Sequence, residues 1–165
     1  MLLAHVAVAG ILFDTVRETR ARNGIIVLVQ PGDAVCAEAA RLNFTVLALG
    51  TRGKRVAALR RQFQEADVYG RVSAIQFDGK TIPCVDGLVN AVVSEATSVD
   101  DAEVMRVLAP GGVALLKNGG QWQKRTKPWP KCMDEWPQYL RAGDNNAVSR
   151  DRVGPPDRLK WTGGT

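Results

Sequence analysis

Residues 25–49 read IIVLVQPGDAVCAEAARLNFTVLAL and contain a complete strand, helix and strand. Residues 25–29 are an uninterrupted apolar run, which is typical of a strand buried on both faces. Pro and Gly at 30–33 indicate a turn, and the alanine-rich segment 34–42 has apolar residues at helical spacing. A second buried strand is predicted at 44–49. This order indicates a β–α–β unit and therefore a parallel sheet.

The same alternation continues to about residue 117. A helix is predicted at 54–66, with Arg55 and Arg60 on its water-facing side. The remaining predicted elements are strands at 72–77, 88–93 and 113–116 and a helix at 99–107. Strands that alternate with helices predict right-handed crossovers and a sheet covered on both faces. We therefore predict an α/β fold, a Rossmann-like three-layer sandwich with a mostly parallel sheet.

The alternation stops at Lys117, and the composition changes there as well. Residues 1–116 contain 12 Lys and Arg against 12 Asp and Glu, whereas 117–165 contain 10 against 5 and hold all four tryptophans. The net charge of +5 therefore belongs to the tail. We predict a Rossmann-like domain at 1–117 and a basic, irregular, Trp- and Pro-rich connector at 118–165, which starts with a flexible hinge at Asn118–Gly120.

Length and composition exclude several classes of protein. A chain of 165 residues has room for one full core. Its three cysteines form no C-x-x-C pair and it has one histidine, so neither a zinc site nor a disulfide framework is predicted. No apolar run reaches the roughly 18 residues of a membrane span. Cys36 lies near the first turn, and we interpret it as an ordinary buried thiol.

Several motifs occur at fixed places in this order of elements. Gly32-Asp33 follows the first strand, FDG at 77–79 comes shortly before a proline, and RVLAPGG at 106–112 precedes the last strand. With these motifs, and the strand LVNAVV between them, residues 11–117 resemble the class I S-adenosylmethionine-dependent methyltransferases, in which an R-x-L-x-P-G-G turn precedes the fifth strand. The resemblance implies S-adenosylmethionine as the cofactor and a small molecule as the substrate.

The resemblance also implies which residues contact the cofactor, because ligands of open parallel sheets bind beyond the carboxyl ends of the strands. These candidates lie on or beside the loops: Gln30, Gly32, Asp33, Gly50, Thr51, Asp78, Gly79 and Asn90. Asp78 matches the family's acceptor for the adenine amine. Asn90 and Glu95 are expected nearest the reacting methyl group, and no catalytic residue is assigned.

The chain departs from the family pattern at two of these loops. The family's first loop is typically Gly-x-Gly-x-Gly, and here the three positions hold Gln30, Gly32 and Ala34. The acidic residue that accepts the ribose hydroxyls at the end of the second strand is replaced by Gly50. Loss of this acceptor predicts a cofactor affinity lower by about two to three orders of magnitude. The predicted function is a methyltransferase-like domain with a degenerate cofactor loop that methylates a small molecule; the alternative is an inactive scaffold or interaction module.

The tail carries a second resemblance. Its segments WPKCMDEWPQYLR at 129–141, DNNAVS at 144–149 and PPDRLKW at 155–161 are similar to the segment that leads into the first blade of pyrroloquinoline-quinone-type β-propeller repeat proteins. The resemblance implies a longer bacterial protein in which a β-propeller domain follows, cut here before its first blade. The basic residues around Trp129 also have the spacing of a single-stranded nucleic-acid site. We prefer a solvated connector, so a nucleic-acid partner is not predicted.

Overall fold

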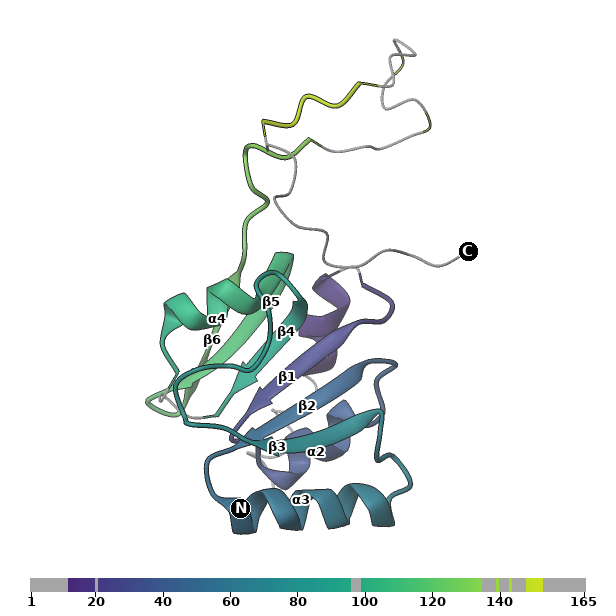
Figure 1. Cartoon of the computed structure of the whole chain (residues 1–165), viewed down its shortest axis with the longest axis vertical. Helices are drawn as coiled ribbons and strands as arrows, with labels where there is room; N and C mark the ends of the chain where they lie inside the picture. The colour runs from purple at the N-terminus through teal and green to yellow at the C-terminus, as the bar shows by residue number, and fades with distance from the viewer. Residues whose placement is uncertain are drawn as a thin grey trace. The chain divides into compact units, whose positions relative to one another are not determined.

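The computed structural model describes residues 12–19, 21–95, 99–134, 139, 143 and 148–152 (Figure 1). The chain divides into two compact units, Met1–Pro128 and Trp129–Thr165. The first unit contains all the strands and helices described below. In the second unit, the backbone N–H of Arg152 donates to Cys132 O at 2.8 Å. Most of the segments that resemble a propeller lie outside the described residues.

The first unit is built on a six-stranded sheet with the order β3-β2-β1-β4-β5-β6. The strands are β1 (Ile25–Val29), β2 (Thr45–Gly50), β3 (Val72–Gln76), β4 (Val89–Ser94), β5 (Leu108–Asn118) and β6 (Gln121–Thr126). The first five are parallel to one another, and β6 runs antiparallel to β5. The order reverses between β1 and β4, so the edge at their carboxyl ends is the expected place for a ligand.

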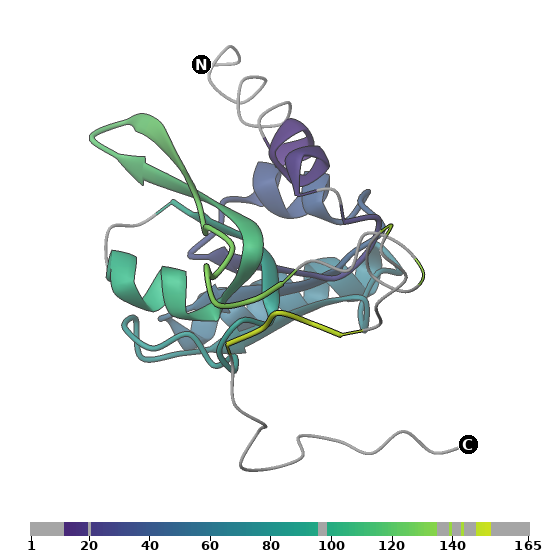
Figure 2. The ribbon, with the colours of Figure 1, turned by 90° about the horizontal axis from the view of Figure 1, so that it is seen from above.

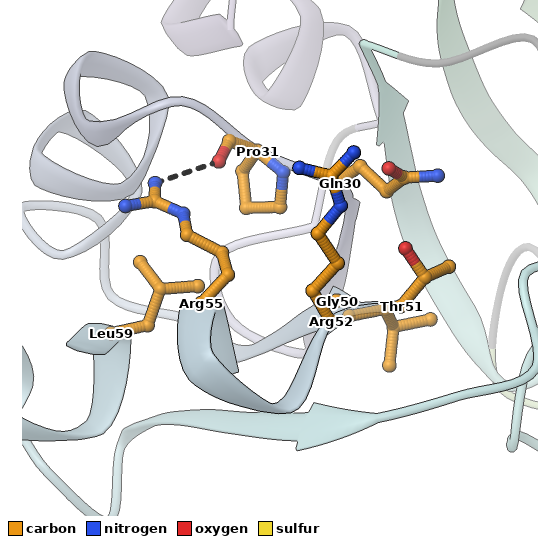
Figure 3. A pocket seen from close by; sticks show the side chains of 8 residues that line it. Gln30, Pro31, Gly50, Thr51, Arg52, Arg55 and Leu59 are labelled. Carbon is orange, nitrogen blue, oxygen red and sulfur yellow. Dashed lines mark hydrogen bonds between the residues drawn. The ribbon is translucent and has the colours of Figure 1, made fainter. Parts of the chain in front are cut away.

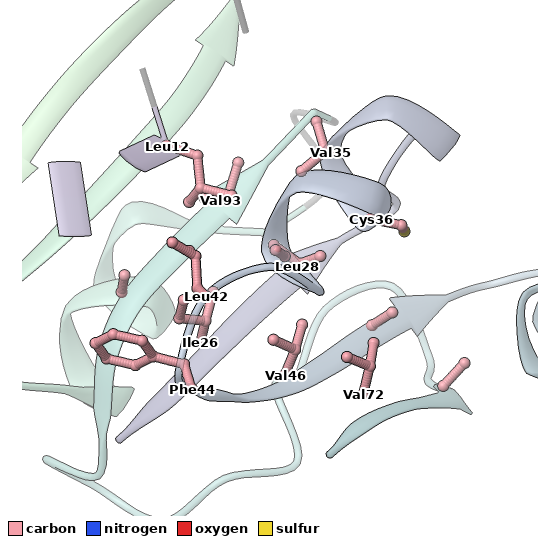
Figure 4. Packing of buried hydrophobic residues seen from close by; sticks show 14 of the residues in the cluster. Leu12, Ile26, Leu28, Val35, Cys36, Leu42, Phe44, Val46, Val72 and Val93 are labelled. Carbon is pink, nitrogen blue, oxygen red and sulfur yellow. The ribbon is translucent and has the colours of Figure 1, made fainter. Parts of the chain in front are cut away.

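Helices cover both faces of the sheet because every central strand is apolar on both sides. The described helices are residues 12–18, α2 (Asp33–Ala39), α3 (Gly53–Glu65) and α4 (Asp101–Val107). On one face, strand residues such as Ile26 and Val46 form a core with residues of the helical segment 12–18, α2 and α3 (Figure 4). On the other face, α4 packs with the buried Phe77 and Ile82 of the segment between β3 and β4. The predicted Rossmann-like α/β fold is confirmed.

The start of the tail differs from the expected hinge. Gly119 and Gly120 have φ of 56° and 84° and form the tight turn of a hairpin between β5 and β6, drawn in green in Figure 2. Two successive positive φ angles are what a two-residue hairpin turn requires. The strand β6 was not expected because its residues are nearly all polar. Its exposed Lys124 pairs with Glu18, with 2.8 Å between Nζ and Oε2.

The boundary predicted at residue 117 therefore lies inside β5, and the first compact unit continues to Pro128. The division into a functional domain and a connector stays a prediction. Within the described residues, none of the helices is both long and apolar enough to cross a membrane.

Candidate functional site

A pocket of about 330 Å³ opens where the loop after β1 and the end of β2 meet the start of α3. Its lining residues come from these segments: Gln30, Pro31, Leu49, Gly50, Thr51, Arg52, Arg55 and Leu59 (Figure 3). The pocket lies at the edge of the sheet where open parallel sheets bind ligands. Three of the residues predicted from sequence, Gln30, Gly50 and Thr51, therefore line the same pocket.

Gln30 directly follows β1 and has a left-handed backbone conformation, with φ of 48°. Its backbone N–H donates to Leu49 O at 2.8 Å, which holds the end of β1 against β2. Residues with a Cβ adopt positive φ rarely because the Cβ crowds a neighbouring carbonyl oxygen. The first loop thus keeps, at Gln30, a backbone conformation that glycine adopts freely.

Glu95 connects the loops that follow β1 and β4, at the point where the strand order reverses. Its Oε2 accepts a hydrogen bond from the Gly32 N–H at 2.5 Å, and its own backbone N–H donates to Val29 O at 3.2 Å. Lys117 Nζ lies 4.0 Å from Glu95 Oε1. A Cβ at Gly32 would lie 3.2 Å from Glu95 Oε2, so the absence of a side chain lets the carboxylate approach the loop closely. Glu95 therefore lies at the carboxyl edge of β1 and β4, and its expected place beside a reacting methyl group stays a prediction.

Asp33 fixes one wall of the pocket through an arginine. Arg55 Nη2 lies 2.8 Å from Asp33 Oδ1 and also donates to Pro31 O at 3.1 Å. Arg55 and Arg60 were expected to face water. This is confirmed for Arg60, which is exposed, and is wrong for Arg55, which is half-buried and lines the pocket. Arg60 Nε donates to Ala74 O at 2.8 Å. Both contacts depend on how α3 docks against the sheet, which helical spacing alone does not show.

Gly50 ends β2 in a place with no room for a side chain. A Cβ at this position would lie 2.8 Å from Cγ2 of Val56, which is 3% exposed. Next to it, Thr51 O accepts a hydrogen bond from Gln76 Nε2 at 3.2 Å. A Cβ on Gly79 would lie 3.2 Å from Thr51 Cγ2, so the loops after β2 and β3 are in contact. The structure therefore brings Gly50, Thr51 and Gly79 together, and their contact with a cofactor stays a prediction.

Asp78 forms the turn that follows β3. Its Oδ1 accepts hydrogen bonds from the backbone N–H groups of Thr81 at 2.7 Å and Lys80 at 2.8 Å. These two bonds stabilise the carboxylate and hold the pKa of Asp78 below its usual value. Gly79 supplies the positive φ of 88° that the turn needs. The side chain of Asp78 is exposed, and its predicted contact with adenine stays a prediction.

Asn90 lies at the opposite edge of the sheet from the pocket, so its expected place is wrong. It is the second residue of β4, and its Oδ1 accepts a hydrogen bond from the backbone N–H of Ile25 at 2.9 Å. Ile25 is the first residue of β1. Because β1 and β4 are parallel, both residues lie at the amino edge. The amide of Asn90 thus joins two strand starts and does not reach the crevice.

The arginine of the 106–112 motif holds the segment between β3 and β4 in place. The Arg106 guanidinium donates to Glu103 Oε1 at 2.7 Å, to Asp86 Oδ1 at 2.5 Å and to Cys84 O at 2.9 Å. Glu103 Oε1 also accepts from the backbone N–H of Ile82 at 2.7 Å. This cluster explains the motif structurally, since it lies on α4 and the 82–86 segment rather than among the pocket residues.

The charge of the pocket was not foreseen from sequence. Arg52 and Arg55 both line it, and none of the lining residues is acidic. The signal available was the position of these arginines, directly after the second strand and in the first turn of the next helix.

Cys36 is buried, and this burial raises the pKa of its thiol to about 12, which agrees with an unreactive core cysteine. Among the described residues, no group of three or more His, Cys, Asp or Glu could hold a metal ion.

No family model matches this sequence, and none of the curated proteins matches it. Solved structures do match. A Methanococcus maripaludis protein classed as an S-adenosyl-L-methionine-dependent methyltransferase is 20% identical with a TM-score of 0.59, over 72% of this chain and 59% of its own. Geranyl diphosphate C-methyltransferase from Streptomyces coelicolor A3(2), with S-adenosyl-L-homocysteine bound, is 18% identical with a TM-score of 0.59, over 67% and 44%.

The [4+2]-cyclase SpnF also matches, at 18% identity and a TM-score of 0.55, over 66% of this chain and 43% of its own. The chain thus spans about half the length of these solved structures. At this level of identity the likeness concerns the fold, and one fold hosts different reactions. From strand order, helix positions and these neighbours together, the chain has the Rossmann-like fold of the class I S-adenosylmethionine-dependent methyltransferases.

Proposed function

We propose that this chain is a methyltransferase-like domain that holds S-adenosylmethionine weakly in the pocket at the ends of β1 and β2 and presents it to a small-molecule acceptor. The observation that carries the proposal is the position of the pocket. The pocket opens beyond the carboxyl ends of these strands. Solved structures with a similar sheet include methyltransferases with S-adenosylmethionine or its demethylated product bound. S-adenosylmethionine supplies an electrophilic methyl group when bound.

The residues of the pocket fit an adenosyl group in part. Gln30 keeps a glycine-like backbone conformation, and Thr51 and Gly79 bring the loops of β2 and β3 together. The end of β2 does not fit, because Gly50 provides no carboxylate for the ribose hydroxyls and the contact with Val56 leaves no space for one. Losing a charge-assisted bidentate acceptor costs a few kcal/mol, or about two to three orders of magnitude in affinity.

A second candidate is an inactive ligand-binding or scaffold module, in a longer protein that continues into a β-propeller. The positive charge of the pocket favours it. S-adenosylmethionine has a net charge of about +1, from a sulfonium and an ammonium against one carboxylate, whereas S-adenosylhomocysteine lacks the sulfonium charge. Arg52 and Arg55 would repel the former more strongly. Weak binding of the cofactor is compatible with both candidates, so methyl transfer needs its own test.

Isothermal titration with S-adenosylhomocysteine and S-adenosylmethionine tests the proposal. We expect dissociation constants in roughly the high micromolar to millimolar range, weaker for S-adenosylmethionine because of its charge. Replacing Gly50 by Asp in a Val56→Ala background should strengthen binding at least about tenfold relative to Val56→Ala alone, because the smaller side chain at position 56 makes room for the carboxylate. No heat and no thermal shift at millimolar ligand would contradict binding.

Methyl transfer is tested separately, by incubating the chain with S-adenosylmethionine and a panel of small hydroxyl, amine and carbon acceptors. Release of S-adenosylhomocysteine above the rate without acceptor supports the methyltransferase. Binding without release on any acceptor favours the scaffold module.

A further inference from the structure

The pocket at the end of β2 carries positive charge that the rest of the described chain does not balance. Arg52 is exposed, lines the pocket and has no side-chain hydrogen-bond or ion-pair partner among the described residues. Arg55 is paired with Asp33 through one nitrogen, at 2.8 Å. In Figure 3 both arginines extend from the start of α3 toward the loop that contains Pro31. The pocket therefore presents a free guanidinium group beside a second one that is partly neutralised.

The location of these groups indicates which part of a ligand they would meet. In doubly wound sheets the end of the second strand contacts the ribose of a bound nucleotide. A carboxylate there selects the free ribose hydroxyls, and an arginine nearby accommodates a phosphate on the ribose. Here β2 ends at Gly50, where Val56 leaves no room for a side chain, and Arg52 follows two positions later. These residues therefore match the kind of nucleotide site that accommodates a phosphate on the ribose.

The remaining walls fit the rest of a nucleoside. Pro31, Leu49 and Leu59 are buried and form the apolar base of the pocket, and Thr51 supplies a polar group. The volume of about 330 Å³ is at the lower end of the range for small-molecule sites, of roughly 300 to 1,000 Å³. Guanidinium groups bind phosphate through two parallel hydrogen bonds, which gives both affinity and orientation.

We infer that this pocket binds a nucleotide through a phosphate monoester on its ribose, with Arg52 as the principal phosphate contact. The inference rests on the pocket and its charge, and not on methyl transfer. Inorganic phosphate offers the same chemistry without the sugar, and adenosine offers the sugar without the phosphate. A comparison of these ligands therefore separates recognition of the nucleotide from attraction of any anion.

The test is titration calorimetry of the full chain with adenosine, adenosine 2′-monophosphate, adenosine 5′-monophosphate and inorganic phosphate. We expect at least one monophosphate to bind on the order of tenfold more tightly than adenosine and than phosphate. Arg52→Ala should remove this advantage and leave adenosine unchanged. Arg61→Ala is the matched control, because Arg61 is exposed on α3, the helix that directly follows Arg52, does not line the pocket and has no side-chain partner among the described residues.

Among the described residues, the Arg52 side chain has no hydrogen-bond or ion-pair partner, so Arg52→Ala should leave the unfolding temperature unchanged. A loss of affinity in this variant therefore reflects the lost contact with the ligand and not unfolding. Equal affinity for adenosine and both monophosphates overturns the inference, as does an equal effect of Arg52→Ala and Arg61→Ala. Inorganic phosphate binding as tightly as the nucleotides overturns the ribose part. S-adenosylhomocysteine is titrated in parallel. If only a monophosphate binds, the proposed function fails and this inference stands. If only S-adenosylhomocysteine binds, this inference fails and the proposed function stands.

Discussion

The contact between Gly50 and Val56 makes a quantitative prediction about the end of β2. Replacing Gly50 by Ala places a methyl group 2.8 Å from Val56 Cγ2. Non-bonded carbon atoms prefer about 3.5–4.0 Å. Val56 is buried and β-branched, so it cannot rotate away freely. Forced overpacking of this kind costs about 1–3 kcal/mol, and we expect Gly50→Ala to lower the free energy of unfolding by about 2 kcal/mol.

The companion variant Val56→Ala removes two buried methyl groups, which costs about 2 kcal/mol, from about 0.8 kcal/mol for each carbon plus part of a cavity. In the double variant the methyl group introduced at position 50 occupies the space that the Val56 methyl left. The two costs should therefore not add. We expect the double variant to be more stable than the sum predicts by about 1–2 kcal/mol.

Urea unfolding followed by far-UV circular dichroism measures these differences, provided that the m-value stays constant across the variants. The control is Gly50→Ala combined with Val72→Ala, because Val72 is buried at the other end of the neighbouring strand β3. That pair should be additive within about 0.5 kcal/mol. Additive costs for Gly50→Ala and Val56→Ala, or a cost below about 0.5 kcal/mol for Gly50→Ala alone, would refute the steric argument.

Three further predictions concern groups outside the pocket. Cys132 is exposed and should react with a thiol reagent in the native protein, whereas Cys36, with its pKa raised by burial, should react only in denaturant; a Cys132→Ser variant checks the assignment. Burial raises the pKa of Glu38 to about 7, so stability should fall as pH rises from about 4.5 to 7, and thermal melts of Glu38→Gln should lack this fall. Arg106→Lys should speed amide hydrogen exchange in 82–86, because Lys cannot bridge Glu103 and the two loop carbonyls.

The sequence was sufficient for the strands and helices of the sheet because their residues are apolar on the faces that become buried. The run at 25–29 matches β1 to the residue, and the helix at 54–66 lies within one residue of α3. The strand β6 gave no such signal. Its pairing depends on the turn at Gly119 and Gly120 and on partners distant in sequence, which residue patterns do not show.

The candidate site was predictable where it depends on strand order, and not where it depends on side-chain docking. Loops after parallel strands had to share one edge, and Gln30, Gly50 and Thr51 line one pocket there. Asn90 does not reach this edge because it is the second residue of β4, and parallel strands place their first residues at the opposite edge. The role of Arg55 was missed because the distance from Asp33 to α3 depends on tertiary packing.

Three residues at or beside the end of β2, Gly50, Arg52 and Val56, together leave the pocket positively charged. Gly50 carries no carboxylate, Val56 leaves no space for one, and Arg52 places a positive charge in the same pocket. Because the sheet order and the positive φ at Gln30 do not depend on the pocket side chains, the backbone frame and the charge of the pocket are separable properties. The frame accounts for the likeness to methyltransferases, and the charge of the pocket favours an anionic ligand on that frame.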